Sequence, residues 1–324
     1  MNAQEKYNYL LNSFPKIIIN SKLKYIASLI GVSQETLSRI RASISWCKVK
    51  KWLVIFSNIC DSLNIEILKN SIIDKKAIIG KNVHIGNFTT IENDVVIGDD
   101  TWIGNNVNIL SGTRISERCK IHAGAILGGI PQDLKYKGEY TLLQIGNNTV
   151  IREFVTINRG TASKGKTIVG NENLIMANTH IGHDCFIGNN CVIGFNVGMS
   201  GEVYVCDWTN ISGFTAIHQF SHIGENSMTS GMSRIVKDVP PYVLAAREPL
   251  SYCGLNLVGL KRRDFEKEKM LELKDIYRIV FQEKRNITQA LKIIEHDFES
   301  TVERDKIIAF IKESTRGIIK GNFQ

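Results

Sequence analysis

Two histidines and a carboxylate lie close together in the middle of the chain. Residues 178–185 read Asn-Thr-His-Ile-Gly-His-Asp-Cys, so His180, His183 and Asp184 surround one aliphatic residue, Ile181. A neutral imidazole is basic enough to take a proton from a hydroxyl near neutral pH. We therefore expect His183 to act as the general base of a group-transfer reaction.

A six-residue repeat surrounds these residues and predicts how they are positioned. An aliphatic residue, with few exceptions, recurs at every sixth position from Ile79 to Leu127, from Ile145 to Ile157 and from Val169 to Ile235. Glycine often follows it. Because six is neither the helical nor the simple strand period, the pattern predicts short strands joined by tight corners, with the aliphatic side chain inside.

This hexapeptide pattern resembles that of the left-handed parallel β-helix family, in which three hexads form one triangular turn of 18 residues. The hexad frame is kept across the gaps after Leu127 and Ile157, so we expect each gap to be an excursion from one continuous coil. Adding one and two turns to His183 gives Gly201 and Gln219. These three should form a column with steps of ~4.8 Å. A base, a backbone amide and an amide side chain would then face one groove, as acyl transfer to a hydroxyl requires.

The repeat also divides the chain. We expect the solenoid over residues 71–255, a cap of about three helices over 256–324, and a linker over 46–70. Apolar stripes at helical spacing support the cap, for example Leu273, Ile276 and Val280.

A short α-helical extension is expected at the start of the chain, over residues 1–45. Its stretch from Tyr25 to Arg41 resembles the helix-turn-helix of cyclic-nucleotide-receptor regulators of bacteria, with Ser33 able to cap the second helix.

Composition narrows the class of protein and the compartment. The net charge of +8 suits an acidic partner. Seven cysteines without a CxxC pair argue against a disulfide framework and against a thiolate zinc site. No apolar run approaches the ~20 residues of a membrane span, and the polar start does not match a secretory signal, so we expect a cytoplasmic protein.

The repeat, its first excursion and the helical cap together resemble the UDP-N-acetylglucosamine O-acyltransferases that begin lipid A synthesis. The resemblance covers roughly residues 70–322. The matching stretches are 130–139, 155–161, 180–184, 216–220, 238–242 and 259–263.

That resemblance implies an activity and its partners. It implies transfer of a 3-hydroxyacyl group from acyl carrier protein to the 3-hydroxyl of UDP-N-acetylglucosamine. It implies no metal and no cofactor other than the carrier's phosphopantetheine. It also implies a homotrimer with active sites in the grooves between subunits.

The resemblance assigns residues as well. It makes His183 the general base, Asp184 the residue that orients it, and Gly201 the oxyanion amide. The residues it assigns to substrate contacts are Asp133, Lys135, His180, His218 and Gln219, with Asn256 and Arg262 reaching the nucleotide or the pantetheine arm.

Three further positions affect specificity by the same resemblance. Gly231 matches a position that limits acyl length, and its lack of a side chain should leave room for a longer chain. Glu202 stands where some members have histidine, and Val258 stands where some have glutamate. The resemblance therefore assigns no contact with the nucleotide or the acyl arm at these two positions.

Three alternatives stay open at this point. A coenzyme A-dependent acetyltransferase could use the same solenoid, and so could a γ-class carbonic anhydrase, although the three-residue spacing of His180 and His183 does not match a three-histidine zinc site. A DNA-binding protein could use Arg39 and Arg41, but basic helices are usually solvated faces, so a nucleic-acid partner is not expected.

Overall fold

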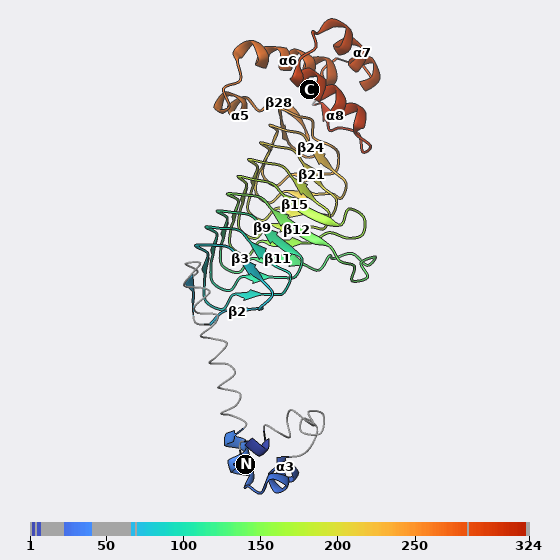
Figure 1. Cartoon of the computed structure of the whole chain (residues 1–324). Helices are drawn as coiled ribbons and strands as arrows, with labels where there is room; N and C mark the ends of the chain where they lie inside the picture. Colours follow the sequence, from blue (N-terminus) through green and yellow to red (C-terminus); the bar gives the residue numbers. More distant parts are fainter. Residues whose placement is uncertain are drawn as a thin grey trace. The chain divides into compact units, whose positions relative to one another are not determined.

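The computed structural model describes residues 2–3, 5–7, 23–40, 66–68, 70–283 and 285–321. The chain separates into two units, Met1–Leu63 and Asn64–Gln324 (Figure 1). Most of the linker predicted over residues 46–70 lies outside the described residues.

The first unit contains a pair of helices joined by a turn. Helix α3 (Leu23–Ile30) ends at Gly31, which has a φ of +78°, and residues 34–40 are again helical. The Ser33 Oγ accepts a hydrogen bond of 3.1 Å from the Thr36 N–H, so Ser33 caps the second helix. The side chains buried between these segments are Tyr7, Ile26, Ala27, Ile30 and Leu37. Arg41, which motivated a DNA-binding role, lies outside the described residues.

Three sheets of short, mostly parallel strands form the solenoid of the second unit (Figure 1). We call them the first, second and third sheets, in the order in which the chain visits them. In the described residues the first sheet contains β1 (Glu66–Ile67), β4 (His84–Ile85), β7 (Trp102–Ile103), β10 (Lys120–Ile121), β13 (Val150–Ile151), β16 (Leu174–Ile175), β19 (Val192–Ile193), β22 (Asn210–Ile211), β25 (Met228–Thr229), β27 (Val243–Ala246), β28 (Ser251–Leu255) and β29 (Lys320–Gly321).

The second and third sheets complete the triangle. The described strands of the second sheet are β2 (Ile72–Ile73), β5 (Thr90–Ile91), β8 (Asn108–Ile109), β11 (Ile126–Gly129), β14 (Thr156–Asn158), β17 (His180–Ile181), β20 (Gly198–Met199), β23 (Ala216–Ile217) and β26 (Arg234–Ile235). Those of the third are β3 (Ile78–Ile79), β6 (Val96–Ile97), β9 (Thr113–Ile115), β12 (Leu142–Ile145), β15 (Lys166–Val169), β18 (Phe186–Ile187), β21 (Tyr204–Val205) and β24 (His222–Ile223). The predicted β-helix is confirmed.

The register between coils follows the 18-residue turn. Along the second sheet, His180 pairs with Gly198, Gly198 with Ala216, and Ala216 with Arg234. Most corners contain a residue in the left-handed backbone region, and many of these residues are asparagine or aspartate, such as Asp184, which tolerate a positive φ best after glycine. Residues 18 apart therefore occupy equivalent places on successive coils.

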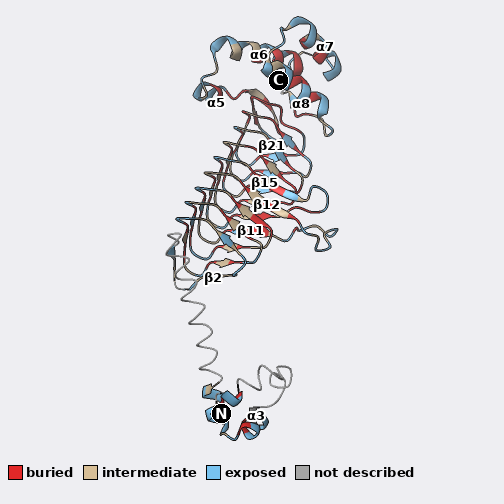
Figure 2. Ribbon diagram, viewed as in Figure 1, coloured by how far each residue is buried: buried red, intermediate tan, exposed pale blue. Residues whose placement is uncertain are grey.

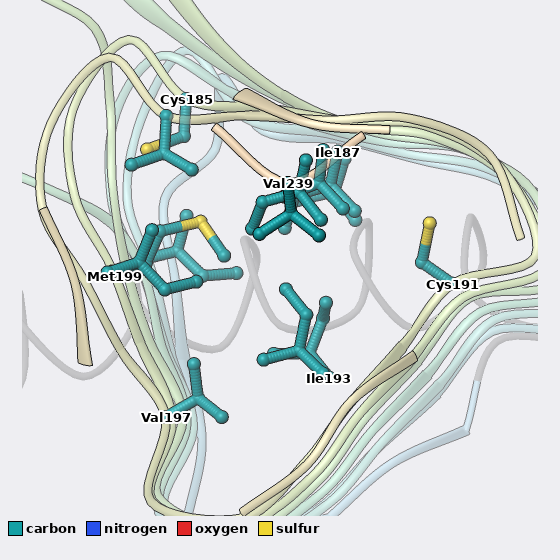
Figure 3. Close-up of a cluster of buried hydrophobic side chains, with 14 of the residues drawn as sticks. Cys185, Ile187, Cys191, Ile193, Val197, Met199 and Val239 are labelled. Atoms are coloured by element: carbon teal, nitrogen blue, oxygen red, sulfur yellow. The ribbon is translucent and has the colours of Figure 1, made fainter. Parts of the chain in front are cut away.

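The aliphatic position of each hexad points into the coil. Ile187, Ile193 and Met199 lie in the interior, and each is 0–1% exposed (Figure 3). Figure 2 shows buried and exposed segments alternating around the coils. Cys185 and Cys191 fill the same core, and burial raises the pKa of each thiol to about 12. These two thiols are therefore core-packing groups and not nucleophiles.

Two excursions interrupt the coil, as the hexad gaps predicted. Residues 130–141 join β11 to β12, and residues 159–165 join β14 to β15 (Figure 1). Coils on either side of each excursion still pair, Thr156 with His180 and Leu143 with Thr113. The excursions therefore extend from the coil without breaking it.

In the described residues the helical cap contains four helices, where about three were expected. The apolar stripes predicted α6 (Lys267–Phe281), α7 (Ile287–Asp297) and α8 (Val302–Glu313). The additional helix is α5 (Leu257–Arg262), whose six residues are too few to show a helical period. In the described part of the chain, no helix combines the length and apolarity that crossing a bilayer requires.

The core predicts unequal effects for the same substitution at two isoleucines. Ile193→Ala removes a side chain with no exposed surface and should lower the free energy of unfolding by about 2–4 kcal/mol. Ile78→Ala, in a strand of the same kind, alters a side chain that is 63% exposed and should change it by less than ~0.5 kcal/mol. Denaturant unfolding measures both, and equal losses would contradict the assignment of an inward aliphatic column.

Candidate functional site

A groove of about 550 Å³ runs along the outer face of the second sheet, beside its corner with the third sheet. Residues of two columns line it. The face column consists of His180, Gly198 and Ala216, which the strand register aligns. The corner column consists of His183, Gly201 and Gln219, which stand 18 residues apart.

Within the corner column, His183 and Gly201 are in direct contact. A Cβ atom added to Gly201 would collide with the imidazole ring of His183. The 18-residue arithmetic therefore places these two residues together, and only glycine leaves room for the imidazole at this position.

The ring of His183 is held in one orientation by Asp184. Its Nδ1 lies 2.8 Å from the Asp184 Oδ2, so Nδ1–H donates to the carboxylate. In the neutral ring Nε2 then carries the lone pair and is the basic atom. Nε2 lies 3.8 Å from the Oδ2 of Asp133, which the first excursion brings to the groove.

Asp184 is itself fixed by the second excursion. Its carboxylate is 1% exposed and accepts hydrogen bonds from the Thr161 N–H (2.9 Å) and the Thr161 hydroxyl (2.6 Å). The Asp184 N–H donates to the Oγ1 of Thr167 at 2.8 Å. A buried carboxylate without such donors would be costly. Thr161 was not assigned a role from the sequence, although it lies in a matching stretch.

The backbone amide of Gly201 is available for a ligand. It donates no hydrogen bond to any residue that the structure describes. At another corner the equivalent amides are occupied: Asn171 N–H donates to Asn189, and Asn189 N–H donates to Asp207. A free amide N–H beside an imidazole is the geometry that stabilises a developing oxyanion.

The other histidines of the groove are also oriented. His180 Nδ1 lies 2.8 Å from the hydroxyl of Thr156, and burial lowers the pKa of His180 below its ordinary value of 6.5. His180 is therefore neutral at physiological pH. His218 Nδ1–H donates to the carbonyl of Gln219 at 2.9 Å, which leaves its Nε2 free to face the groove.

Lys135 and Glu202 lie close to residues of the groove in the chain. Lys135 shares a turn with Asp133, whose Oδ1 accepts a hydrogen bond from the Lys135 N–H at 2.9 Å. Glu202 follows Gly201, and its Oε2 is 3.9 Å from the Nζ of Lys164.

Asn256, Arg262, Val258 and Gly231 do not line the groove of their own chain. The amide of Asn256 is occupied, because it caps α5 and donates to the carbonyl of Asn226 at 2.9 Å. Among the described residues, no group of three histidines, cysteines or carboxylates lies close enough to bind a metal ion.

The contacts of Asp184 predict that Thr161 positions the base. Thr161→Val removes the hydroxyl at nearly constant volume, so kcat should fall about 10–100-fold with little change in KM, since a hydrogen bond to a carboxylate contributes 1.5–3 kcal/mol. Thr161→Ser should retain most of the rate. Steady-state kinetics of both variants measure these effects.

A matched control is Thr101→Val, which removes another buried hydroxyl, one that donates to the carbonyl of Ser116. It should lower stability without changing kcat. An unaltered rate in Thr161→Val, or an equal loss in Thr101→Val, would contradict the positioning role.

Two family models match parts of this chain. A family model described as UDP N-acetylglucosamine O-acyltransferase, domain 2, matches residues 238–319. The bacterial transferase hexapeptide model matches residues 94–129 and 166–201. Neither match reaches residues 25–41, so the resemblance of that stretch to cyclic-nucleotide-receptor regulators is not supported.

Two curated relatives share the name of one enzyme. The acyl-[acyl-carrier-protein]–UDP-N-acetylglucosamine O-acyltransferase of Chlorobaculum parvum is 47% identical over 207 residues, which cover 64% of this chain and 78% of the relative. The enzyme of the same name from Thiobacillus denitrificans is 39% identical over 204 residues, 63% of this chain and 79% of the relative.

Solved structures agree with these relatives. The UDP-N-acetylglucosamine acyltransferase of Bacteroides fragilis superimposes with a TM-score of 0.78 at 46% identity, over 78% of this chain and 100% of its own. A structure from Acinetobacter baumannii gives a TM-score of 0.76 at 37% identity, over 79% and 99% of the two chains.

Proposed function

This chain belongs to the family of acyl-[acyl-carrier-protein]–UDP-N-acetylglucosamine O-acyltransferases, and from that premise we propose how its groove carries out the transfer. The enzyme moves an acyl group from acyl carrier protein to UDP-N-acetylglucosamine in lipid A biosynthesis. The acyl group is proposed to be a 3-hydroxyacyl group, and the acceptor the 3-hydroxyl of the sugar.

The observation that carries this proposal is the contact between His183 and Gly201. A basic Nε2 oriented by Asp184 lies against a residue whose amide N–H is unoccupied in the described structure. Acyl transfer needs a base for the attacking hydroxyl and a donor for the carbonyl oxygen that becomes negative, and the two must stand on either side of one carbon. The corner column supplies this pair.

The proposed reaction has two steps. His183 Nε2 accepts the proton of the sugar hydroxyl as its oxygen attacks the thioester carbon, and the Gly201 N–H donates to the resulting oxyanion. The tetrahedral intermediate then collapses with cleavage of the C–S bond. The imidazolium returns its proton to the departing thiolate, so the products are the sugar ester and the free thiol of the carrier. Asp184 stabilises the imidazolium between the two steps.

The surrounding polar residues are proposed to bind the substrates. Neutral His180, with the free Nε2 of His218 and the amide of Gln219, provides hydrogen bonds along the groove. Asp133 and Lys135 of the first excursion are proposed to bind the sugar nucleotide from the opposite side. Asp133 would then contact the acceptor sugar, because it already faces Nε2 of His183.

A homotrimer is proposed for the assembly, with each groove completed by a second copy. Asn256 and Arg262, which do not line the groove of their own chain, would then contact the nucleotide or the carrier in the groove of a neighbour. Gly231 is likewise proposed to limit the length of the acyl chain from the groove of a neighbouring subunit. The cytoplasmic location expected from the sequence stays a prediction.

Mass spectrometry of the sugar-nucleotide product tests the reaction. The purified protein is given UDP-N-acetylglucosamine with a mixture of carrier-bound 3-hydroxyacyl and unsubstituted acyl chains, together with acetyl coenzyme A. A product heavier by one 3-hydroxyacyl group is expected. An acetylated product would instead favour the coenzyme A-dependent alternative.

The role of His183 is tested in the same assay. His183→Ala should reduce the rate about 10²–10⁴-fold, the usual contribution of a positioned base, while its melting temperature stays close to that of the wild type. His222→Ala, which changes an exposed histidine of the third sheet outside the groove, should leave the rate unaltered. A near-normal rate in His183→Ala would exclude the proposed mechanism.

A further inference from the structure

Both columns of the groove reach a cation when they are continued by one turn toward the helical cap. The face column continues from His180 through Gly198 and Ala216 to Arg234. Three steps of ~4.8 Å place Arg234 about 14 Å along the sheet from His180. One turn beyond the last residue of the corner column is Lys237.

The guanidinium of Arg234 is not engaged by any other residue that the structure describes. It is exposed and makes no hydrogen bond or ion pair with any residue in the described ranges. Arg234 and Val236 line both the groove and a second cavity of about 280 Å³ between the solenoid and the cap. The two hollows therefore meet at Arg234.

The second cavity is predominantly basic. Lys237 and Lys320 line it together with Arg234, and Glu248 is the one carboxylate that the described residues contribute. The ammonium of Lys237 donates to the carbonyl of Arg316 at 3.1 Å, which holds this cation at the edge of the cavity. An excess of two positive charges favours an anionic ligand.

The groove between His180 and Arg234 is open and uncharged. Its face-column residues are Gly198 and Ala216, and a Cβ added at Gly198 would meet no atom within 4 Å. An extended, neutral chain can therefore lie along the second sheet with a reactive end at His183 and an anionic end at Arg234.

The separation between His180 and Arg234 distinguishes the phosphate of the donor's arm from the phosphates of the sugar nucleotide. An extended chain advances ~1.2 Å per bond, since the three bonds of one residue span 3.3–3.6 Å. About thirteen bonds separate the thioester sulfur of a phosphopantetheine arm from its phosphorus, or ~16 Å. Only about five bonds separate the sugar 3-oxygen from the nearer phosphorus of the nucleotide, or ~6 Å. The separation of about 14 Å fits the arm and not the sugar nucleotide.

We propose that Arg234, assisted by Lys237 and Lys320, binds the phosphate of the donor's phosphopantetheine arm. A guanidinium recognises phosphate oxygens through paired hydrogen bonds, and both lysines add compensating charge. The inference rests on the proposed function, because it takes the thioester to react at His183. It places the arm along the second sheet and the carrier protein at the cap end of the solenoid.

Two small donors test this assignment: an acyl-pantetheine and its 4′-phosphate, both with the same acyl chain. The wild-type enzyme should use the phosphorylated donor with kcat/KM about tenfold higher. Arg234→Ala should lose most of this preference by raising KM for the phosphorylated donor. The KM for UDP-N-acetylglucosamine should not change.

Arg118→Ala is the matched control, because it removes an exposed arginine at a corner of the solenoid, away from the groove, and should keep the preference. Equal use of both donors by the wild type, or an undiminished preference in Arg234→Ala, would overturn the inference. A rise in KM for UDP-N-acetylglucosamine alone would overturn it in favour of the nucleotide diphosphate. If the wild type turns over neither small donor nor the thioester of acyl carrier protein, the proposed function is refuted, and this inference with it.

Discussion

The burial of one aliphatic side chain in every six residues is the constraint on which the rest of the structure depends. Each such residue removes apolar surface from water, worth about 1.5–3 kcal/mol for a complete side chain. It also fixes the register, because a slip of one residue would turn the whole inward set toward solvent. Residues 18 apart consequently lie above one another, and the site is assembled from single residues of successive coils.

The excursions add what a regular coil cannot provide. The carboxylate of Asp184 occupies a corner where it is almost fully buried, and the hexads offer it few donors. Residues 159–165 bring the amide and hydroxyl of Thr161 to that carboxylate, while residues 130–141 bring Asp133 to the opposite side of His183. The solenoid therefore sets the spacing of the base and the amide, and the excursions set their orientation and surroundings.

Much of this arrangement could be predicted from the sequence because the period is strict. The hexads predicted the β-helix, and simple addition brought His183 together with Gly201. Thr161 was missed, since its contact depends on the path of an irregular segment that no period describes. Helix α5 was missed because it is short. Adding 18 to Ala216 and Gln219 gives Arg234 and Lys237, so their positions could have been predicted. Their role as an anion site could not, because it depends on the cavity beside the cap, which the hexad period does not predict.

The central claim is that His183 and Gly201 act on the same carbon. A crystal structure of the enzyme with its acylated sugar nucleotide tests this most directly. The account predicts the ester oxygen within about 3.2 Å of His183 Nε2 and the carbonyl oxygen within the same distance of the Gly201 amide nitrogen. A product whose ester lies on another face of the solenoid, away from both atoms, would contradict it.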